Sequence, residues 1–314
     1  MPSRELRKRT TVEDSAARGV SSAGETRNAR APMTAAYVGL TKPRQTALLM
    51  ATGVGAYLMG AATPVEWRTF ALGMLALAAA ISGSTVLNMV LDRDIDRVMH
   101  RTLGRPLPSG SVALPQAVAL GAGFSAAGAG GAWLLDPLFG AVVTFGVLLD
   151  VVVYTWWLKR RTAAAILIGG ISGGMPALAG RTLAVGAIDT VGLLLAAGVV
   201  LWIPAHILTL AMKHGDEYAE AGVPTWPNVH GEASTRRLIA VATVGAAAVL
   251  VAAGVVAEIA PVALGALGLA GAGIAGLAVY ALARPAERHD WLLFKAASVY
   301  MLVAFICLTM GAVV

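Results

Sequence analysis

Long apolar runs recur along most of this chain and constrain its fold more than any other feature of the sequence. Most are about 20 residues long, the length that a helix needs to cross the hydrocarbon core of a bilayer. Because 57% of the 314 residues are hydrophobic and only 13% are charged, the chain is too apolar for a soluble domain. The sequence therefore predicts an all-α polytopic membrane protein with spans at about 45–62, 69–91, 113–134, 138–157, 163–180, 190–212, 236–257, 261–283 and 292–314.

The positions of lysine and arginine test this count. They gather before the first run and after the second, fourth, sixth and eighth, whereas the other side of the membrane carries only Arg68 and Arg181. This positive-inside asymmetry supports nine transmembrane helices, with the N-terminus in the cytoplasm and the C-terminus outside the cell (inner) membrane. We expect the nine helices to surround a central cavity. The net charge of +6 follows this topology, so nucleic acid is not an expected partner. Residues 1–33 are polar and lack the apolar core of a signal peptide, which predicts a disordered cytoplasmic tail ahead of a membrane domain at 34–314.

The densest charged segment outside the tail is 88–106, at the end of the second apolar run. If the helix continues through it, Asn88, Asp92 and Asp96 place oxygen ligands on nearly the same face, one per turn. Such a stripe suits a hard cation such as Mg²⁺. Arginine forks suit phosphate, and four arginines interleave with these acids: Arg93, Arg97, Arg101 and Arg105. An ordinary charged helix end remains the alternative for this spacing alone.

A second acidic cluster follows the sixth run on the same predicted side of the membrane and contains Asp216, Glu217 and Glu220. Two carboxylate clusters that face one cavity could hold Mg²⁺ ions that bridge to a diphosphate. Lys159 and Arg160, which end the fourth run on that side, could bind the same diphosphate or serve only as membrane anchors.

His206 lies near mid-membrane depth in the sixth run. Ionisable groups inside a membrane usually face a cavity or a partner, so His206 is a functional candidate, with Trp202 close to the same helical face. The alternative is a buried histidine that donates to a backbone carbonyl freed by Pro204. Asp150 is a second intramembrane group, four residues before Tyr154 and within reach of a hydrogen bond to it.

Together these motifs resemble the UbiA superfamily of intramembrane prenyltransferases, and within it the branch that farnesylates heme. The likeness covers about residues 34–314. It rests on the first motif with its R-T-x-x-R-P-L continuation, on the Tyr154 to Gly170 segment, and on the block from His206 to Pro227. The chain departs from the family pattern at Pro204-Ala205-His206, where two prolines or P-H-F are common, and at Gly180-Arg181-Thr182, where Gly-Trp-Ala is usual.

The resemblance implies a Mg²⁺-dependent transfer of a farnesyl group from farnesyl diphosphate to a vinyl group of heme b, with water addition, to give heme O. It implies catalytic roles for Asn88, Asp92, Asp96 and Asp216. The implied metal ligands are Asp92, Asp96, Asp216, Glu217 and Glu220. The implied diphosphate-binding residues are Arg101, Arg105, Lys159 and Arg160, and the implied acceptor-binding residues are His206, Trp202 and Tyr154.

Two other functions stay open at this point. A UbiA-type enzyme could use another acceptor, such as an aromatic quinone precursor or a lipid alcohol. An ion-coupled transporter would distribute its acids through the membrane depth, whereas most acids of this chain gather at the cytoplasmic ends of the runs. Membrane lipid surrounds the chain in either case. The sequence leaves open the prenyl length, the heme orientation, the oligomeric state and any partnership with a heme A synthase or an oxidase assembly factor.

Overall fold

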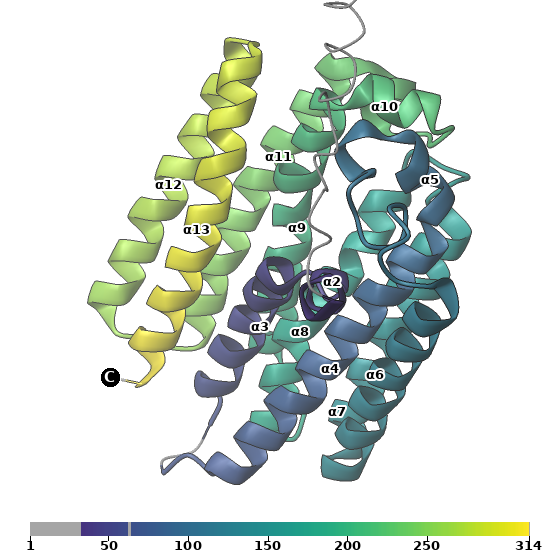
Figure 1. Ribbon diagram of the computed structural model, residues 1–314. Helices are drawn as coiled ribbons and strands as arrows, with labels where there is room; N and C mark the ends of the chain where they lie inside the picture. Colours follow the sequence, from purple (N-terminus) through teal and green to yellow (C-terminus); the bar gives the residue numbers. More distant parts are fainter. Residues whose placement is uncertain (1–32, 62–63, 314) are drawn as a thin grey trace, which may run out of the picture.

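The computed structural model describes residues 33–61 and 64–313. Nearly all of the predicted tail at 1–33 lies outside the described residues; Met33 begins the short helix α2 (Met33–Leu40). The described part of the chain is helical and contains no β-strand, which confirms the all-α class (Figure 1).

Long helices form at each of the predicted apolar runs. In chain order they are α3 (Pro43–Leu58), α4 (Trp67–Leu91), α6 (Leu114–Leu135), α7 (Pro137–Leu148) with its π-helical continuation η2 (Leu149–Leu158), α8 (Ala165–Val185), α9 (Thr190–Lys213), α11 (Trp226–Val256), α12 (Pro261–Ala283) and α13 (Glu287–Val313).

Seven helical segments of the described chain are long and apolar enough to cross a membrane, with α7 and η2 taken as one. They establish a multi-pass membrane protein, but they do not confirm the predicted number of nine. The two helices that fall short are α3, which has only 16 residues, and α8, which contains Pro176 and the charged Arg181.

Small residues bring neighbouring helices into backbone contact. A Cβ atom on Gly180 of α8 would collide with the backbone oxygen of Gly53 on α3, and one on Gly128 of α6 would collide with the backbone nitrogen of Ala80 on α4. In lipid, such close approach replaces the hydrophobic effect as the force that joins helices. These contacts set the wall positions of the cavity described below.

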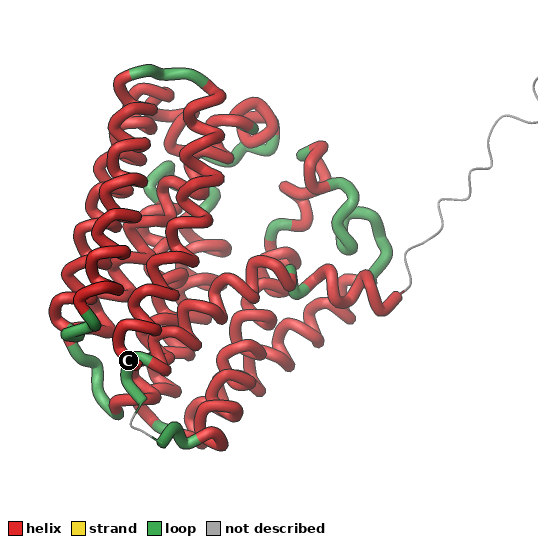
Figure 2. The backbone as a smooth tube through the Cα atoms, turned by 90° about the vertical axis from the view of Figure 1, so that its left-hand side faces the viewer, coloured by secondary structure: helices red, strands yellow, loops and turns green. Residues whose placement is uncertain are grey.

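The two polar loops that carry the acidic clusters lie at the same end of the bundle (Figure 1). One holds α5 (Arg93–Val98) and η1 (His100–Thr102), and the other holds α10 (Gly215–Glu220). Ile95 and Met99 of the first loop pack against Val223 after the second, with all three buried. The C-terminus lies at the opposite end of the bundle (Figure 1), and Figure 2 shows the bundle from the side, with its helices joined by loops.

Candidate active site

A cavity of about 600 Å³ opens between α3, α4, η2, α8 and α9. Its size is within the usual range for small-molecule sites. Most of the predicted site residues line it: Asn88, Asp92, Asp96, Arg101, Arg105, Tyr154, Lys159, Trp202 and His206. Arg160, Asp216, Glu217 and Glu220 do not.

The helix is interrupted within the first acidic motif, whereas the placement of its three oxygen ligands on one face assumed a continuous helix. α4 ends at Leu91, and Asp92, with φ −89° and ψ 3°, joins it to α5. The four-residue spacing survives the break because the backbone N–H of Asp92 still donates to the Asn88 carbonyl at 2.9 Å, and that of Asp96 to the Asp92 carbonyl at 2.8 Å. The three side chains therefore still reach one cavity.

Two of the three acids that line the cavity, Asp92 and Asp96, are buried, and each forms an ion pair with a basic side chain. Lys159 Nζ pairs with Asp92 Oδ2, and Arg105 Nη1 lies 2.7 Å and 2.8 Å from the two carboxylate oxygens of Asp96. The residues Asp92 and Asp96 are only 8% and 3% exposed, so either charge would be costly without its partner. The second oxygen of Asp92, Oδ1, is buried and has no hydrogen-bond partner in the described structure.

The five predicted metal ligands do not meet. In residues 33–61 and 64–313, no three histidine, cysteine or acidic side chains lie close enough to share one ion. Glu217 instead joins the two loops, because it accepts a hydrogen bond from the Arg101 backbone N–H at 3.2 Å and contacts His214 Nδ1 at 3.0 Å. The Arg101 N–H is the main reason that the pKa of Glu217 lies below its ordinary value. The shared metal set stays a prediction.

Arg160 braces the first motif from outside the cavity. Its Nη1 lies 2.6 Å from Asp94 Oδ2, and its Nη2 donates to the Leu91 carbonyl at 2.7 Å. The hydrogen bond from Arg160 lowers the pKa of Asp94 to about 2. Arg160 thus fixes the end of η2 against the end of α4 and helps to hold neighbouring Lys159 at the cavity.

Lys42 lines the charged end of the cavity, although we predicted no functional role for it from the sequence. Its backbone is left-handed, with φ 43° and ψ 67°, immediately before Pro43. This conformation is rare for residues other than glycine and is disfavoured before proline, and such strain concentrates at functional sites. Burial, with the nearby charges of Arg105 and Lys159, lowers the pKa of Lys42 to about 8. The Lys-Pro pair ahead of an apolar run was the only signal in the sequence.

A polar network lies one helical turn deeper than Asp92. The Asn88 amide donates to Asp150 Oδ2 at 2.7 Å, and the Thr155 hydroxyl donates to Asn88 Oδ1 at 2.9 Å. The expected hydrogen bond between Asp150 and Tyr154 does not form. Asp150 reaches Asn88 instead, and the ring of Tyr154 packs against Gly169. Both ends of the Asn88 amide are therefore fixed in orientation.

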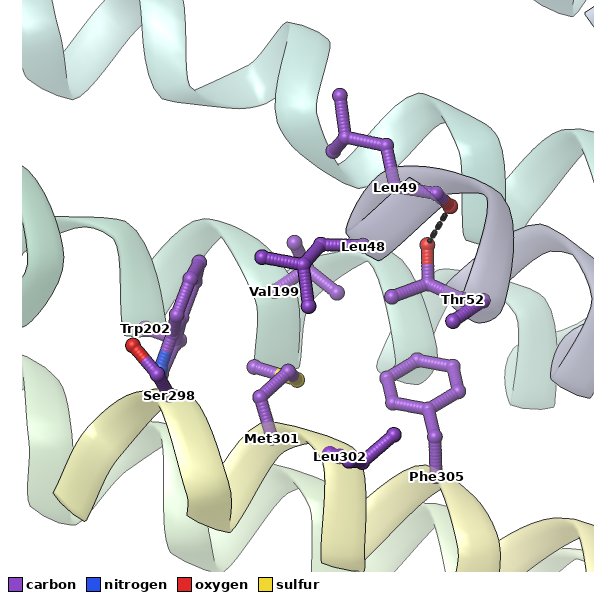
Figure 3. A pocket seen from close by; sticks show the side chains of 10 residues that line it. Leu48, Leu49, Thr52, Val199, Trp202, Ser298, Met301, Leu302 and Phe305 are labelled. Carbon is purple, nitrogen blue, oxygen red and sulfur yellow. Dashed lines mark hydrogen bonds between the residues drawn. The ribbon is translucent and has the colours of Figure 1, made fainter. Parts of the chain in front are cut away.

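His206 and Trp202 stand one turn apart on α9 with their rings stacked, 5.0 Å between centroids. The Trp202 indole donates to the Ala297 carbonyl of α13 at 2.7 Å, which fixes the ring. Behind them a crevice of about 50 Å³ runs between α3, α9 and α13, and Figure 3 shows Trp202 and Ser298 together at one end of it. His206 has Ser298 as its neighbour and not a carbonyl freed by Pro204.

Comparison with known proteins places this geometry among intramembrane prenyltransferases. Residues 48–306 match the UbiA prenyltransferase family. The protoheme IX farnesyltransferase of Desulforudis audaxviator is 37% identical over 86% of this chain and 86% of its own length, and that of Korarchaeum cryptofilum is 39% identical over 65% and 69%. A UbiA homologue from Archaeoglobus fulgidus, solved with DMAPP and Mg²⁺, superposes with a TM-score of 0.65 over 87% of this chain and 98% of its own, at 14% identity.

Proposed function

Because this chain belongs to the UbiA prenyltransferase family, we propose that it transfers a farnesyl group from farnesyl diphosphate to a vinyl group of heme b, with addition of water, to give heme O. The observation that carries the proposal is a single cavity with buried ion pairs of Asp92 and Asp96 at one end and His206 in its wall. The relatives that are protoheme IX farnesyltransferases support heme as the acceptor.

The charged end suits the diphosphate. Lys159 and Arg105 are already held by buried acids, so their donors need little rearrangement when a phosphate arrives. Arg101 and Lys42 line the same end and add positive charge. As the carbon–oxygen bond breaks, these cations stabilise the negative charge that collects on the leaving diphosphate. We assign this end to the cytoplasmic face from the lysine and arginine asymmetry of the loops.

The acids at this end fit a magnesium ion. Carboxylate oxygens are its preferred ligands, and the buried Asp92 Oδ1 has no partner in the described chain. Asp92 and Asp96 would hold the ion, and Asp216 remains a predicted ligand that does not line the cavity in the described structure. Bound Mg²⁺ would neutralise charge on the diphosphate and so make it a better leaving group. The Mg²⁺ and DMAPP bound to the Archaeoglobus homologue support this assignment.

The rest of the cavity suits the farnesyl chain. Below the charged end the wall is formed largely by apolar side chains, among them Leu49, Leu77, Ile81 and Met175. Such a wall binds an isoprenoid by the hydrophobic effect and keeps bulk water from the allylic cation. An apolar chamber with one polar end also fixes which end of the substrate reaches the acids.

The bond changes balance without a redox partner. The bond between carbon 1 of the farnesyl group and the diphosphate oxygen breaks, and its electron pair leaves with the diphosphate. The vinyl π electrons form the new carbon–carbon bond to carbon 1. A water molecule attacks the carbocation that remains next to the porphyrin. The attached water then loses a proton to solvent, so that the product carries a hydroxyl group.

The test uses membranes that contain the full chain, incubated with heme b, farnesyl diphosphate and Mg²⁺. We expect a heme product whose mass increases by one farnesyl group plus one water molecule, and no product when Mg²⁺ is chelated. Control membranes contain an Asp92→Asn variant, which keeps the side-chain size but removes the charge. An unchanged heme, with farnesyl transferred to an aromatic acid or a lipid alcohol instead, would overturn the heme assignment.

A further inference from the structure

The imidazole of His206 is stacked against aromatic rings of two helices. Trp202 of α9 stacks on one face, with 5.0 Å between ring centroids and 20° between planes. Phe294 of α13 also stacks on the imidazole, at 4.7 Å and 20°, and Trp291 stacks on Phe294 at 4.7 Å and 12°. Because rings from two helices stack on the imidazole, it cannot turn freely, and its nitrogens at the ring edge are the groups left to meet a partner.

One edge of the imidazole meets Ser298. His206 Nδ1 lies 3.4 Å from Ser298 Oγ, and the Ser298 hydroxyl lies 3.3 Å from the Phe294 carbonyl, to which it donates. A hydroxyl has a single proton. If the carbonyl takes that proton, Ser298 Oγ is left to accept, and the proton of the neutral imidazole must sit on Nδ1. The tautomer assigned in this way leaves a lone pair on Nε2.

The two nitrogens face different spaces. Ser298 lies at the crevice between α9 and α13 in Figure 3, so Nδ1 is directed toward α13. His206 itself lines the large cavity, together with Ile203 and Ile207 of the same helix. In the part of the chain that the structure describes, no hydrogen bond to His206 Nε2 is formed. The free lone pair is therefore available to a molecule in the cavity.

We propose that His206 binds the iron of the porphyrin acceptor through Nε2, with Ser298 as the positioning residue that sets the tautomer. Imidazole nitrogen is a favourable ligand for iron, and a hydrogen bond at the other ring nitrogen commonly orients such a histidine. Trp202 and Phe294 fix the plane of the ring, and the Trp202 indole is itself tied to Ala297 of α13. The inference rests on the proposed function and adds the orientation of the acceptor, with its iron on the α9 side of the cavity.

The experiment compares iron porphyrin with metal-free porphyrin. Purified full-length protein in detergent is titrated with ferric heme and, separately, with metal-free protoporphyrin IX, without farnesyl diphosphate. We expect wild type to show the absorption and electron paramagnetic resonance spectrum of histidine-ligated heme. His206→Gln, close in size, should lose that spectrum and weaken heme binding by about tenfold or more, while metal-free porphyrin binds as in wild type.

Ser298 variants test the tautomer. Ser298→Ala should weaken heme binding by roughly tenfold and leave metal-free porphyrin binding unchanged, because only the lone pair on Nε2 is affected. Ser298→Thr keeps the hydroxyl, so it should show the same heme spectrum as wild type, unlike Ser298→Ala. His289→Ala is the matched control, since this histidine lies near the start of α13, outside the cavity, and contacts the Arg284 carbonyl.

Four outcomes would overturn the inference. Equal loss of heme and metal-free porphyrin in His206→Gln would mean that the ring only packs against the acceptor. Nitrogen NMR of the wild type could show that the imidazole proton is on Nε2, and Nε2 would then have no free lone pair to bind iron. Heme bound without a nitrogen ligand in wild type would contradict the inference alone, whereas wild type that binds neither porphyrin would contradict the proposed function as well.

Discussion

The two parts of the cavity are organised by different forces. At the charged end, Asp92 and Asp96 are buried and each is neutralised by a cation from another segment, Lys159 or Arg105. At the acceptor side, His206 has no charged partner in the described residues and is held by stacked rings. Under the proposed function, charge pairing suits the first part to a reaction in which charge separates, and packing suits the second part to a flat acceptor. Changes of charge should therefore act on the chemical step, and changes of shape on acceptor binding.

The largest expected effect is at Asp92. Asp92→Ala removes the proposed metal ligand and leaves the Lys159 ammonium buried without its partner, so we expect turnover to fall by about a thousandfold or more. Two-substrate kinetics in membranes measures the change in kcat and in each KM. His206→Gln is the comparison and should raise mainly the KM for heme. If the two variants changed kcat and the two KM values in the same way, the proposed contrast between the charged end and the His206 side of the cavity would be wrong.

Asp216 decides whether the second acidic cluster belongs to the charged end. The sequence predicts that Asp216→Ala abolishes turnover like Asp92→Ala, although Asp216 does not line the cavity in this structure. A loss that matches Asp92→Ala would mean that the α10 loop closes over the substrate. Turnover close to wild type would restrict the metal site to the first motif.

A packing change should affect both parts together. Gly180→Ala places a methyl group against the backbone of Gly53, where neither helix can yield cheaply, and we expect a loss of about 2 kcal/mol in the free energy of unfolding. Gly123→Ala is the control, because nothing lies within 4 Å of the position of its added Cβ. Thermal unfolding in detergent measures both. Equal midpoints for the two variants would contradict the close contact between α3 and α8.

The pH dependence of farnesyl diphosphate use should reflect Lys42. Its pKa is lowered to about 8, so the cation is present below pH 8 and is lost as the pH rises through that value. We expect kcat/KM for farnesyl diphosphate to fall by up to about tenfold per pH unit above 8 if the cation is essential. Lys42→Arg, which stays charged, should remove this fall. An identical pH profile in the variant would exclude Lys42 from substrate binding.

The smallest effect is expected at Asp94. Its pKa is lowered to about 2 in the fold against an ordinary value of 3.8, so its pairing with Arg160 stabilises the fold above about pH 4 and is lost as the pH falls toward 2. The Asp94 side chain is 66% exposed, and solvent screening limits the contribution. Asp94→Asn should therefore cost less than about 1 kcal/mol at pH 7. Denaturation at pH 7 and near pH 2 should show the difference only at the higher pH.

Much of the fold could be predicted because hydropathy is a local property. The predicted run at 69–91 and the helix α4 differ by only two residues at one end, since an apolar segment of this length has one stable form in lipid. α11 is the clearest miss, because its short first part, 226–230, was not predicted; beyond the kink at Gly231 the helix continues into the predicted run at 236–257. The segment up to Arg237 carries no apolar signal, and the chain turns at Gly231, with φ 76°.

The site was predicted less completely. Acids and arginines in one motif indicated the charged end, and the resemblance supplied the roles. Lys42 was not predicted as a site residue, because its position at the cavity depends on its left-handed backbone conformation. A single Lys-Pro pair in the sequence does not specify that conformation. The Glu217 contact with Arg101 spans 116 residues and also carries no sequence signal.

The sequence by itself determined that this is a helical membrane protein, where its apolar helices lie along the chain, and which motif carries the acids. Those features depend on residues close together in the chain. Only the tertiary structure decided that Asn88 donates a hydrogen bond to Asp150 and that Lys159 neutralises Asp92. It also decided that the rings of Trp202 and Phe294 stack on His206. Each is a contact between different helices or loops, fixed by how far each helix is rotated and how closely its glycines let it approach its neighbours.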